Sequence, residues 1–242
     1  MIEITSLTKT YGGGAKAVRA LNGVDLKIEN CVFRTTWGTA PEAGIDLEPN
    51  HPEERLENCM IRNCRFENNR GAGIAFWLGP LSAKSPPISI TFENCRVSSD
   101  RGGGIFVGGI KDDGPMGTIR FRNCVVEDVD GYGLLLSGKS ADRAFVSFEK
   151  CAFRRTARHD IFTKPISIAA RNNVAVTRLG GVRFDNCRVE DDRDRPFLSI
   201  SDNGTGAGLS LVTGSITVVN PHGARMEPGP EAEKVELKVK SK

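Results

Sequence analysis

Asp46 and Glu48 are the acidic residues whose spacing best suits catalysis. In a β-strand, residues two apart share one face, and their α-carbons lie roughly 6.6 Å apart. Carboxyl groups at that spacing can act as acid and base, or as acid and nucleophile, on a glycosidic bond. The alternative is that both are solvated surface residues, paired with Arg34 or Arg70. We treat Asp46 and Glu48 as candidate catalytic residues.

Aromatic and basic residues accompany this acidic pair. Trp37 and Trp77 are the only tryptophans in the chain, and an exposed indole suits stacking on the apolar face of a sugar. Arg70 and Arg101 occupy corresponding turns, and Asp130 occupies the next one. The two arginines could neutralise a uronate, as a lyase or epimerase requires, or could form a surface ladder with Asp130. All five are candidate substrate-binding residues.

Two polar residues precede those arginines in the same turns. Asn68 lies two positions before Arg70, and Asp100 lies directly before Arg101. Each could bind sugar hydroxyl groups, or could cap its turn by hydrogen bonding to the local backbone. Both are therefore further candidates for substrate binding.

His159 is the third candidate catalytic residue. Its neighbours Arg158, Asp160 and Lys164 could complete a proton-transfer group, and we also expect Lys164 to contact substrate. The alternative is a lone exposed histidine. The acidic turns at 127–130 and 190–194 could bind calcium, or could be solvated turns, and no other cofactor and no zinc spacing is indicated.

A repeated motif must position all of these residues. It consists of Asn-Cys with an apolar residue three positions before the Cys and another two positions after it. Lys150 replaces the Asn in one copy. The Cys spacings are 33, 31, 29, 27 and 36 residues, which is typical of stacked structural units. The repeated cysteines are Cys31, Cys64, Cys95, Cys124, Cys151 and Cys187.

Each repeat has the apolar alternation of short, half-buried strands and no helical period. We predict an all-β fold, a single-stranded right-handed parallel β-helix of about 7–8 coils, with three strands in each coil. The recurring Asn is expected at the turn between the second and third strands, because Asn tolerates the αL conformation. The stacked cysteines are expected to be buried free thiols.

The third strands should form a groove along the stack. Their outward residues are expected to be Asp46 and Glu48, Ala75 and Trp77, Phe106 and Gly108, Leu135 and Ser137, and Phe162 and Lys164. The segment at 165–181 is expected to be a variable loop, and its Ile-Ser-Ile and Val-Ala-Val stretches could form an extra flap.

The repeat pattern I-x-x-N-C-x-F-x-N-N-x-G-x-G-I resembles the right-handed β-helix proteins of the pectin-lyase-like superfamily, over about residues 24 to 202. The resemblance implies this fold, and an extracellular or cell-surface location, although the chain starts without a signal-peptide pattern. It does not select one activity, because the superfamily includes lyases, hydrolases, epimerases and non-catalytic repeat domains. The Asn-Thr-Asp with Gly-His-Gly of polygalacturonases and the Asp-Pro-His-Glu of mannuronan epimerases are both missing.

Composition limits the remaining classes. The net charge of +3 is spread over the sequence, which argues against nucleic acid as a partner, and no apolar run is long enough to span a membrane. We expect one β-helix domain at 1–220, with a degenerate first coil at 1–25, and a tail or cap at 221–242. The oligomeric state stays open.

The expected function is binding or cleavage of an extended, acidic polysaccharide or oligosaccharide. We favour a glycoside hydrolase that uses Asp46 and Glu48, followed by a lyase or epimerase that uses Arg70, Arg101 and His159. The alternative is a non-catalytic scaffold, similar to an adhesin or a tail fibre.

Overall fold

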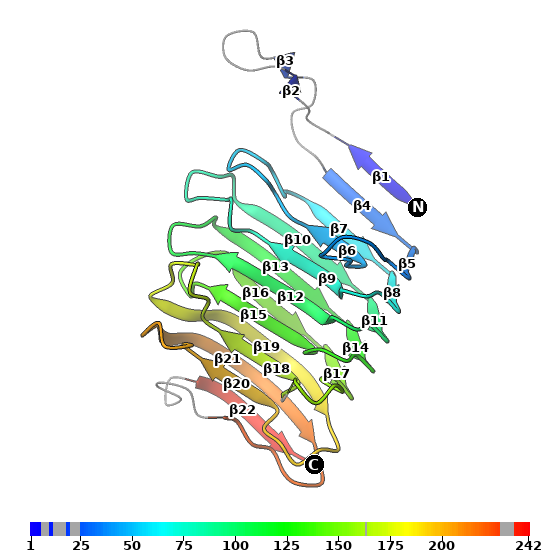
Figure 1. The fold of residues 1–242 in the computed structure, drawn as a ribbon, viewed down its shortest axis with the longest axis vertical. Coiled ribbons are helices and arrows are strands. Elements are labelled where there is room, and N and C mark those ends of the chain that lie inside the picture. The colour runs from blue at the N-terminus through cyan, green and yellow to red at the C-terminus, as the bar shows by residue number, and fades with distance from the viewer. Residues whose placement is uncertain (6–9, 12–17, 20–24, 163, 228–234) are drawn as a thin grey trace.

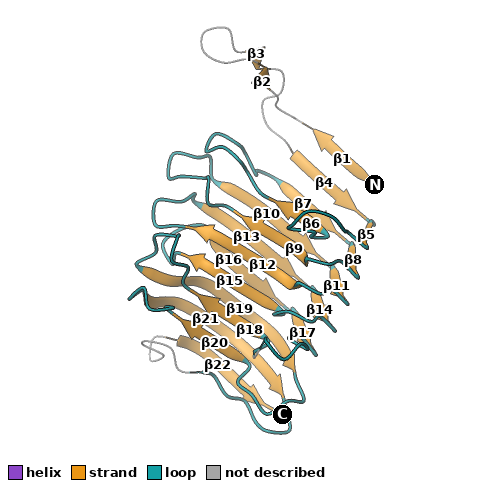
Figure 2. Cartoon of the chain, viewed as in Figure 1, coloured by secondary structure: helices purple, strands orange, loops and turns teal. Residues whose placement is uncertain are grey.

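The protein is a parallel β-solenoid, seen in a computed structural model that describes residues 1–5, 10–11, 18–19, 25–162, 164–227 and 235–242 (Figure 1). The described residues contain strands and loops and no helix (Figure 2). The predicted all-β solenoid fold is therefore confirmed. The right-handed sense of the coil stays a prediction.

Each coil contributes one strand to each of three faces. The first face consists of β4 (Asp25–Glu29), β7 (Cys59–Arg62), β10 (Ile88–Glu93), β13 (Gly117–Arg122), β16 (Phe145–Glu149) and the start of β19 (Arg178–Glu190). The second face consists of β5 (Val32–Arg34), β8 (Arg65–Glu67), β11 (Arg96–Ser98), β14 (Val125–Glu127), β17 (Ala152–Arg154) and the end of β19. The third face consists of β6 (Ile45–Leu47), β9 (Ala72–Trp77), β12 (Gly103–Ile110), β15 (Leu134–Lys139), β18 (Ile166–Ala169) and β20 (Leu198–Ser201).

In the described part of the chain the stack therefore contains six complete coils, fewer than the 7–8 predicted. At one end, β1 (Ile2–Thr5) pairs antiparallel with β4, so it does not continue the parallel coil. A short antiparallel pair, β2 (Thr10–Tyr11) and β3 (Val18–Arg19), follows it, and the rest of 1–25 lies outside the described residues. At the other end, β21 (Gly208–Val219) continues the first two faces, and β22 (Val235–Ser241) pairs parallel with β21.

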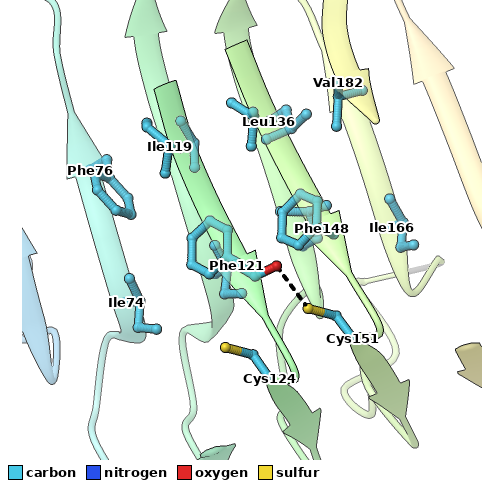
Figure 3. Close-up of a cluster of buried hydrophobic side chains, with 14 of the residues drawn as sticks. Ile74, Phe76, Ile119, Phe121, Cys124, Leu136, Phe148, Cys151, Ile166 and Val182 are labelled. Carbon is cyan, nitrogen blue, oxygen red and sulfur yellow. Dashed lines mark hydrogen bonds between the residues drawn. The ribbon is translucent and has the colours of Figure 1, made fainter. Parts of the chain in front are cut away.

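The core consists of equivalent positions of successive coils, which stack in register. Phe92, Phe121, Phe148 and Phe184 are aligned on neighbouring strands of the first face, and consecutive rings stack with centroids 5.2, 4.9 and 5.3 Å apart. All four rings are fully buried. These are the residues three positions before each Cys, as the sequence predicted. Figure 3 shows part of this column with the aliphatic side chains from the third face that pack on it.

The repeated cysteines line the same interior as free thiols, which confirms the prediction. Each thiol from Cys64 onward donates to a carbonyl group of the preceding coil; Cys151 Sγ, for example, lies 3.4 Å from the carbonyl oxygen of Phe121 (Figure 3). Cys31, in the first coil, is only partly buried. Stacking thus satisfies the weak thiol donor without a disulfide.

The repeated Asn turns the chain between the first and second strands, so the predicted place between the second and third strands was wrong. All six residues at this corner, including Lys150, adopt αL conformation with φ between 51° and 56°. Asn63 donates to Asn30, and Asn94 donates to Asn63, each over 3.2 Å. A single αL residue suffices for this corner because its neighbours stay extended.

Candidate functional site

The outer surface of the third face carries the candidate site. Strand register places Asp46, Ala75, Phe106 and Leu135 in one outward column, as predicted. The fifth coil differs, because Ile166–Ala169 pairs with β15 and places Ser167 beside Leu135. The predicted outward residues of this coil, Phe162 and Lys164, were therefore wrong, as was the assignment of the Ile-Ser-Ile stretch to a loop. The turn before this strand is longer than in other coils, which shifted the expected register.

Asp46 and Glu48 form an interacting carboxyl pair. Asp46 lies in β6, Glu48 directly follows that strand, and both residues are exposed. Partial desolvation, followed by the charge of Glu48 and a hydrogen bond with it, raises the pKa of Asp46 to about 6. The two carboxyl groups are therefore close enough to influence each other's ionisation. Asp46 can hold its proton in the weakly acidic range.

An apolar groove of about 270 Å³ lies beside this pair. Ala75, the neighbour of Asp46 in the outward column, is one of its lining residues. Among the residues that the structure describes, none with a charged side chain lines it. The groove is lined by Pro41, Gly71, Ala72, Ala75, Gly102, Gly103, Gly104, Ile105, Phe106, Tyr132 and Leu135. Its contributions from four successive coils make it long enough for a chain-like ligand. The sequence does not indicate Pro41 or Tyr132 as groove residues, because residues in turns reach the groove only when neighbouring coils pack side by side.

A second pocket, the flap pocket, lies beyond Trp77 and has a volume of about 320 Å³. It is lined by Trp77, Gly79, Pro80, Gly109, Lys111, Asn173 and Val174. The residues at 170–177, which we call the flap, follow β18 in the fifth coil and reach back to Trp77 in the second. The Val-Ala-Val stretch lies within this flap, as the sequence suggested.

Trp77 is not an open stacking platform. The guanidinium carbon of Arg171, in the flap, lies 4.6 Å from the centroid of the Trp77 ring. One indole face is therefore covered by a cation, so the expectation that a sugar stacks there is not met in this structure. Trp37 is 69 % exposed in the turn before β6 and lines neither the apolar groove nor the flap pocket.

The predicted column of turn residues exists, although not as a simple basic patch. The Arg101 amide donates to the carbonyl of Asn69, and the Asp130 amide donates to that of Asp100, so the turns do stack coil on coil. The guanidinium of Arg70 pairs with Glu42 over 3.2 Å, while Arg101 is exposed. Arg70 already has a partner within the protein, which weakens its case as a uronate ligand.

Asp100 and Asn68 have structural positions. Asp100 is fully buried, and its Oδ1 accepts the backbone N–H of Asn69, which agrees with the capping alternative and not with the binding of sugar hydroxyl groups. Asn68 is exposed at the αL corner between β8 and β9, with φ of 56°. Asn69, the next residue, is the buried member of this turn, and its side-chain oxygen accepts the backbone N–H of Thr36.

His159 is exposed four coils away from the carboxyl pair. At about 4.8 Å per coil this is roughly 19 Å, so His159 cannot act on the same bond as Asp46. Its proposed partners also face elsewhere: Arg158 lies 3.8 Å from Asp128, and Asp160 lies 3.6 Å from Arg193. Lys164 pairs with Glu227 over 2.6 Å, away from the proposed proton-transfer group.

Arginines neutralise the acidic turns considered for calcium. Asp128 binds Arg155 over 2.7 Å, and Asp191 binds Arg195 over 2.6 Å in a buried pair. In the part of the chain that the structure describes, no cluster of three His, Cys, Asp or Glu side chains could hold a metal ion. The same described ranges contain no helix long and apolar enough to cross a membrane.

Comparison with family models, with curated protein sequences and with solved structures gives no match to this chain. The strand register alone therefore defines its class. The protein is a parallel β-solenoid of six coils, whose third face carries a carboxyl pair, an apolar groove and a flap.

Proposed function

We propose that this protein is a carbohydrate-active β-solenoid that binds an extended glycan along its third face and hydrolyses it with Asp46 and Glu48. The contact between these two carboxyl groups, at the edge of the apolar groove, carries the proposal. The repeat's likeness to the pectin-lyase-like superfamily supports the same class.

The two carboxyl groups suit different roles. Asp46, whose pKa is raised to about 6, keeps its proton into the weakly acidic range and can act as the general acid. Glu48 then acts as the base or nucleophile. Both side chains are exposed, so rotation about their Cα–Cβ bonds can separate them when a glycosidic bond enters. The Phe106 and Tyr132 side chains in the groove offer apolar surface to sugar rings.

A non-catalytic glycan-binding scaffold is the second candidate. The specific observation in its favour is that neither Asp46 nor Glu48 is among the residues that line the apolar groove. A lyase or epimerase has less support, because Arg70, Arg101 and His159 lie on the second, third and fifth coils and Arg70 is paired with Glu42.

A glycan panel separates these functions. Reducing ends and the absorbance of unsaturated uronates are measured together for the parent protein, Asp46→Asn and Glu48→Gln. We expect the parent to release reducing ends without that absorbance, and each variant to lose activity by about 100-fold or more. Glu93→Gln, a charge-matched change on the first face, should retain parental activity.

Other outcomes identify the alternatives. Absorbance that survives both substitutions would move the chemistry to the arginine and histidine positions. Glycan binding without either signal would support the scaffold. Equal losses in Glu93→Gln and Asp46→Asn would show that the effect is a general charge effect and would contradict the proposed site.

A further inference from the structure

We propose that the flap pocket is a binding site for the anionic group of a sugar, a carboxylate or a sulfate ester, with Arg171 as its main ligand. The inference rests on the proposed function only in taking a glycan as the ligand, and it is independent of catalysis. It follows from how the flap holds Arg171, from the charges around it, and from the contrast with the apolar groove.

Arg171 is positioned before any ligand arrives. Its guanidinium stacks on Trp77, and its Nε donates to the side-chain oxygen of Asn173 over 3.0 Å. Among the described residues, no carboxylate forms an ion pair with Arg171, and its two terminal nitrogens make no hydrogen bond. These nitrogens form a fixed fork that suits a planar carboxylate or two sulfate oxygens, and little side-chain entropy remains to be lost.

The C-terminal end of the flap is held by contacts that do not involve Arg171. Asp112 accepts hydrogen bonds from the backbone N–H and the hydroxyl of Thr177, both over 2.8 Å, and its own N–H donates to the carbonyl of Ala175 over 2.9 Å. Val174 fits against Gly138, where a Cβ atom would lie within 2.8 Å of it. The position of the flap therefore does not depend on Arg171.

The charges near the pocket favour an anion. Lys111 lines the pocket and is only loosely paired, with its Nζ 3.7 Å from Asp113. The carboxylate of Asp112 is already hydrogen-bonded within the protein, because the hydroxyl groups of Ser140 and Thr177 both donate to it. Lys111 thus lines the cavity, and Arg171 contacts two of its lining residues, Trp77 and Asn173, without lining it.

The apolar groove has the opposite character. Its lining within the described ranges is uncharged, and the carboxyl pair of Asp46 and Glu48 at its edge would repel an anionic sugar. The rings of Phe106 and Trp77 separate the two pockets over Gly108, where a Cβ atom would lie 2.6 Å from the first ring and 3.1 Å from the second. The substrate class that fits both is a glycan with a neutral sugar at the groove and an anionic sugar at the flap.

Tryptophan fluorescence tests this site directly. In a Trp37→Phe background, Trp77 is the only indole, and it contacts the proposed ligand Arg171. The probes are glucose, glucuronate and glucose 6-sulfate, titrated at low ionic strength. We expect both anions to change the Trp77 emission, with weaker binding as salt is added, and glucose to leave it unchanged. The two anion arms identify which group the site prefers.

Substitutions define the residues, with affinities measured by ligand-observed NMR so that the readout does not depend on the indole. Arg171→Gln should weaken anion binding about tenfold or more, because it removes charge-assisted hydrogen bonds. Arg171→Lys should retain only part of the affinity, and Lys111→Gln should lose less. Arg120→Gln, an equal charge change at an exposed position of β13, should bind as the parent does.

Three results would overturn the proposal: glucose binding as tightly as the anions, anion binding unchanged in Arg171→Gln, or an equal loss in Arg120→Gln. Asp46→Asn should keep its anion binding. A failed hydrolase assay and a failed anion assay therefore report on different sites.

Discussion

Asp100 shows how one residue can break the pattern of its own column. One coil earlier, Asn69 accepts the backbone N–H of Thr36 and donates its amide to the carbonyl of Phe33 over 3.3 Å. Asp100 repeats the first contact, with the N–H of Asn69, but its Oδ2 is buried without a partner. An ionised carboxylate cannot supply the donor that Asn69 supplies, whereas a protonated one can.

The pH dependence of this residue follows from its burial. Desolvation, opposed by hydrogen bonds from Asn69, raises the pKa of Asp100 to about 7 from 3.8. Because the folded-state pKa is the higher one, protonated Asp100 stabilises the fold fully below about pH 4, and this contribution is lost as the pH rises through 7. We expect Asp100→Asn to be more stable than the parent by roughly 1–3 kcal/mol near pH 8, with a much smaller difference near pH 4.

Thermal unfolding followed by circular dichroism across this pH range measures the difference. Asp113→Asn makes the same charge change at an exposed residue and should show no such trend. A stability difference that does not vary with pH would mean that Asp100 has the same pKa in the folded and unfolded states. Its burial would then make no contribution to the pH dependence, and the prediction would be wrong.

At the scale of the turn, the first corner of each coil shows the same kind of exception. Asn residues occupy this αL corner in five of the six coils, and Lys150 occupies it in the fifth coil with φ of 52°. The αL region costs an ordinary L-residue roughly 1–2 kcal/mol, and Asn less. Lys150 also interrupts the column between Asn123 and Asn186.

Lys150→Asn should therefore stabilise the protein by about 0.5–1 kcal/mol and raise its melting temperature. The reverse change, Asn94→Lys, should cost more, because Asn94 also donates to Asn63. Calorimetry of both variants tests the corner. A neutral Lys150→Asn together with a neutral Asn94→Lys would show that the corner conformation does not limit stability.

The repeat predicts most of this architecture because each structural position recurs in the sequence once in every coil. The apolar residues beside each Cys, the free thiols and the outward column from Asp46 to Leu135 all followed from that repetition. The third strand of the fifth coil did not follow from the repetition, because β18 can be assigned only by its pairing with β15. The contact between Arg171 and Trp77 could not be predicted from the sequence either, because it joins a loop to a strand three coils away.

At the scale of the whole molecule, each strand pairs only with strands of the neighbouring coils, although the flap reaches a coil three steps away. Stability should therefore be transmitted along the stack mainly step by step. The last strand, β22, pairs with β21 through its whole length and places Val235, Leu237 and Val239 against the end of the core. It thereby covers a strand edge that would otherwise be open to pairing with other chains. The effect of losing β22 should accordingly be greatest at the neighbouring strand.

Val239→Asp tests this coupling, because it places a charge against the core at the end of the stack. We expect it to detach β22 at a local cost of about 1–3 kcal/mol, and hydrogen exchange should become faster at the amides of β21. Lys238→Asp, on the outward side of the same strand, should leave exchange unchanged. Protection of β10 and β13 should persist in both variants, since several coils separate them from β22. Loss of protection throughout the chain would mean that the solenoid unfolds as one cooperative unit, and that its ends control the stability of the third-face site as well.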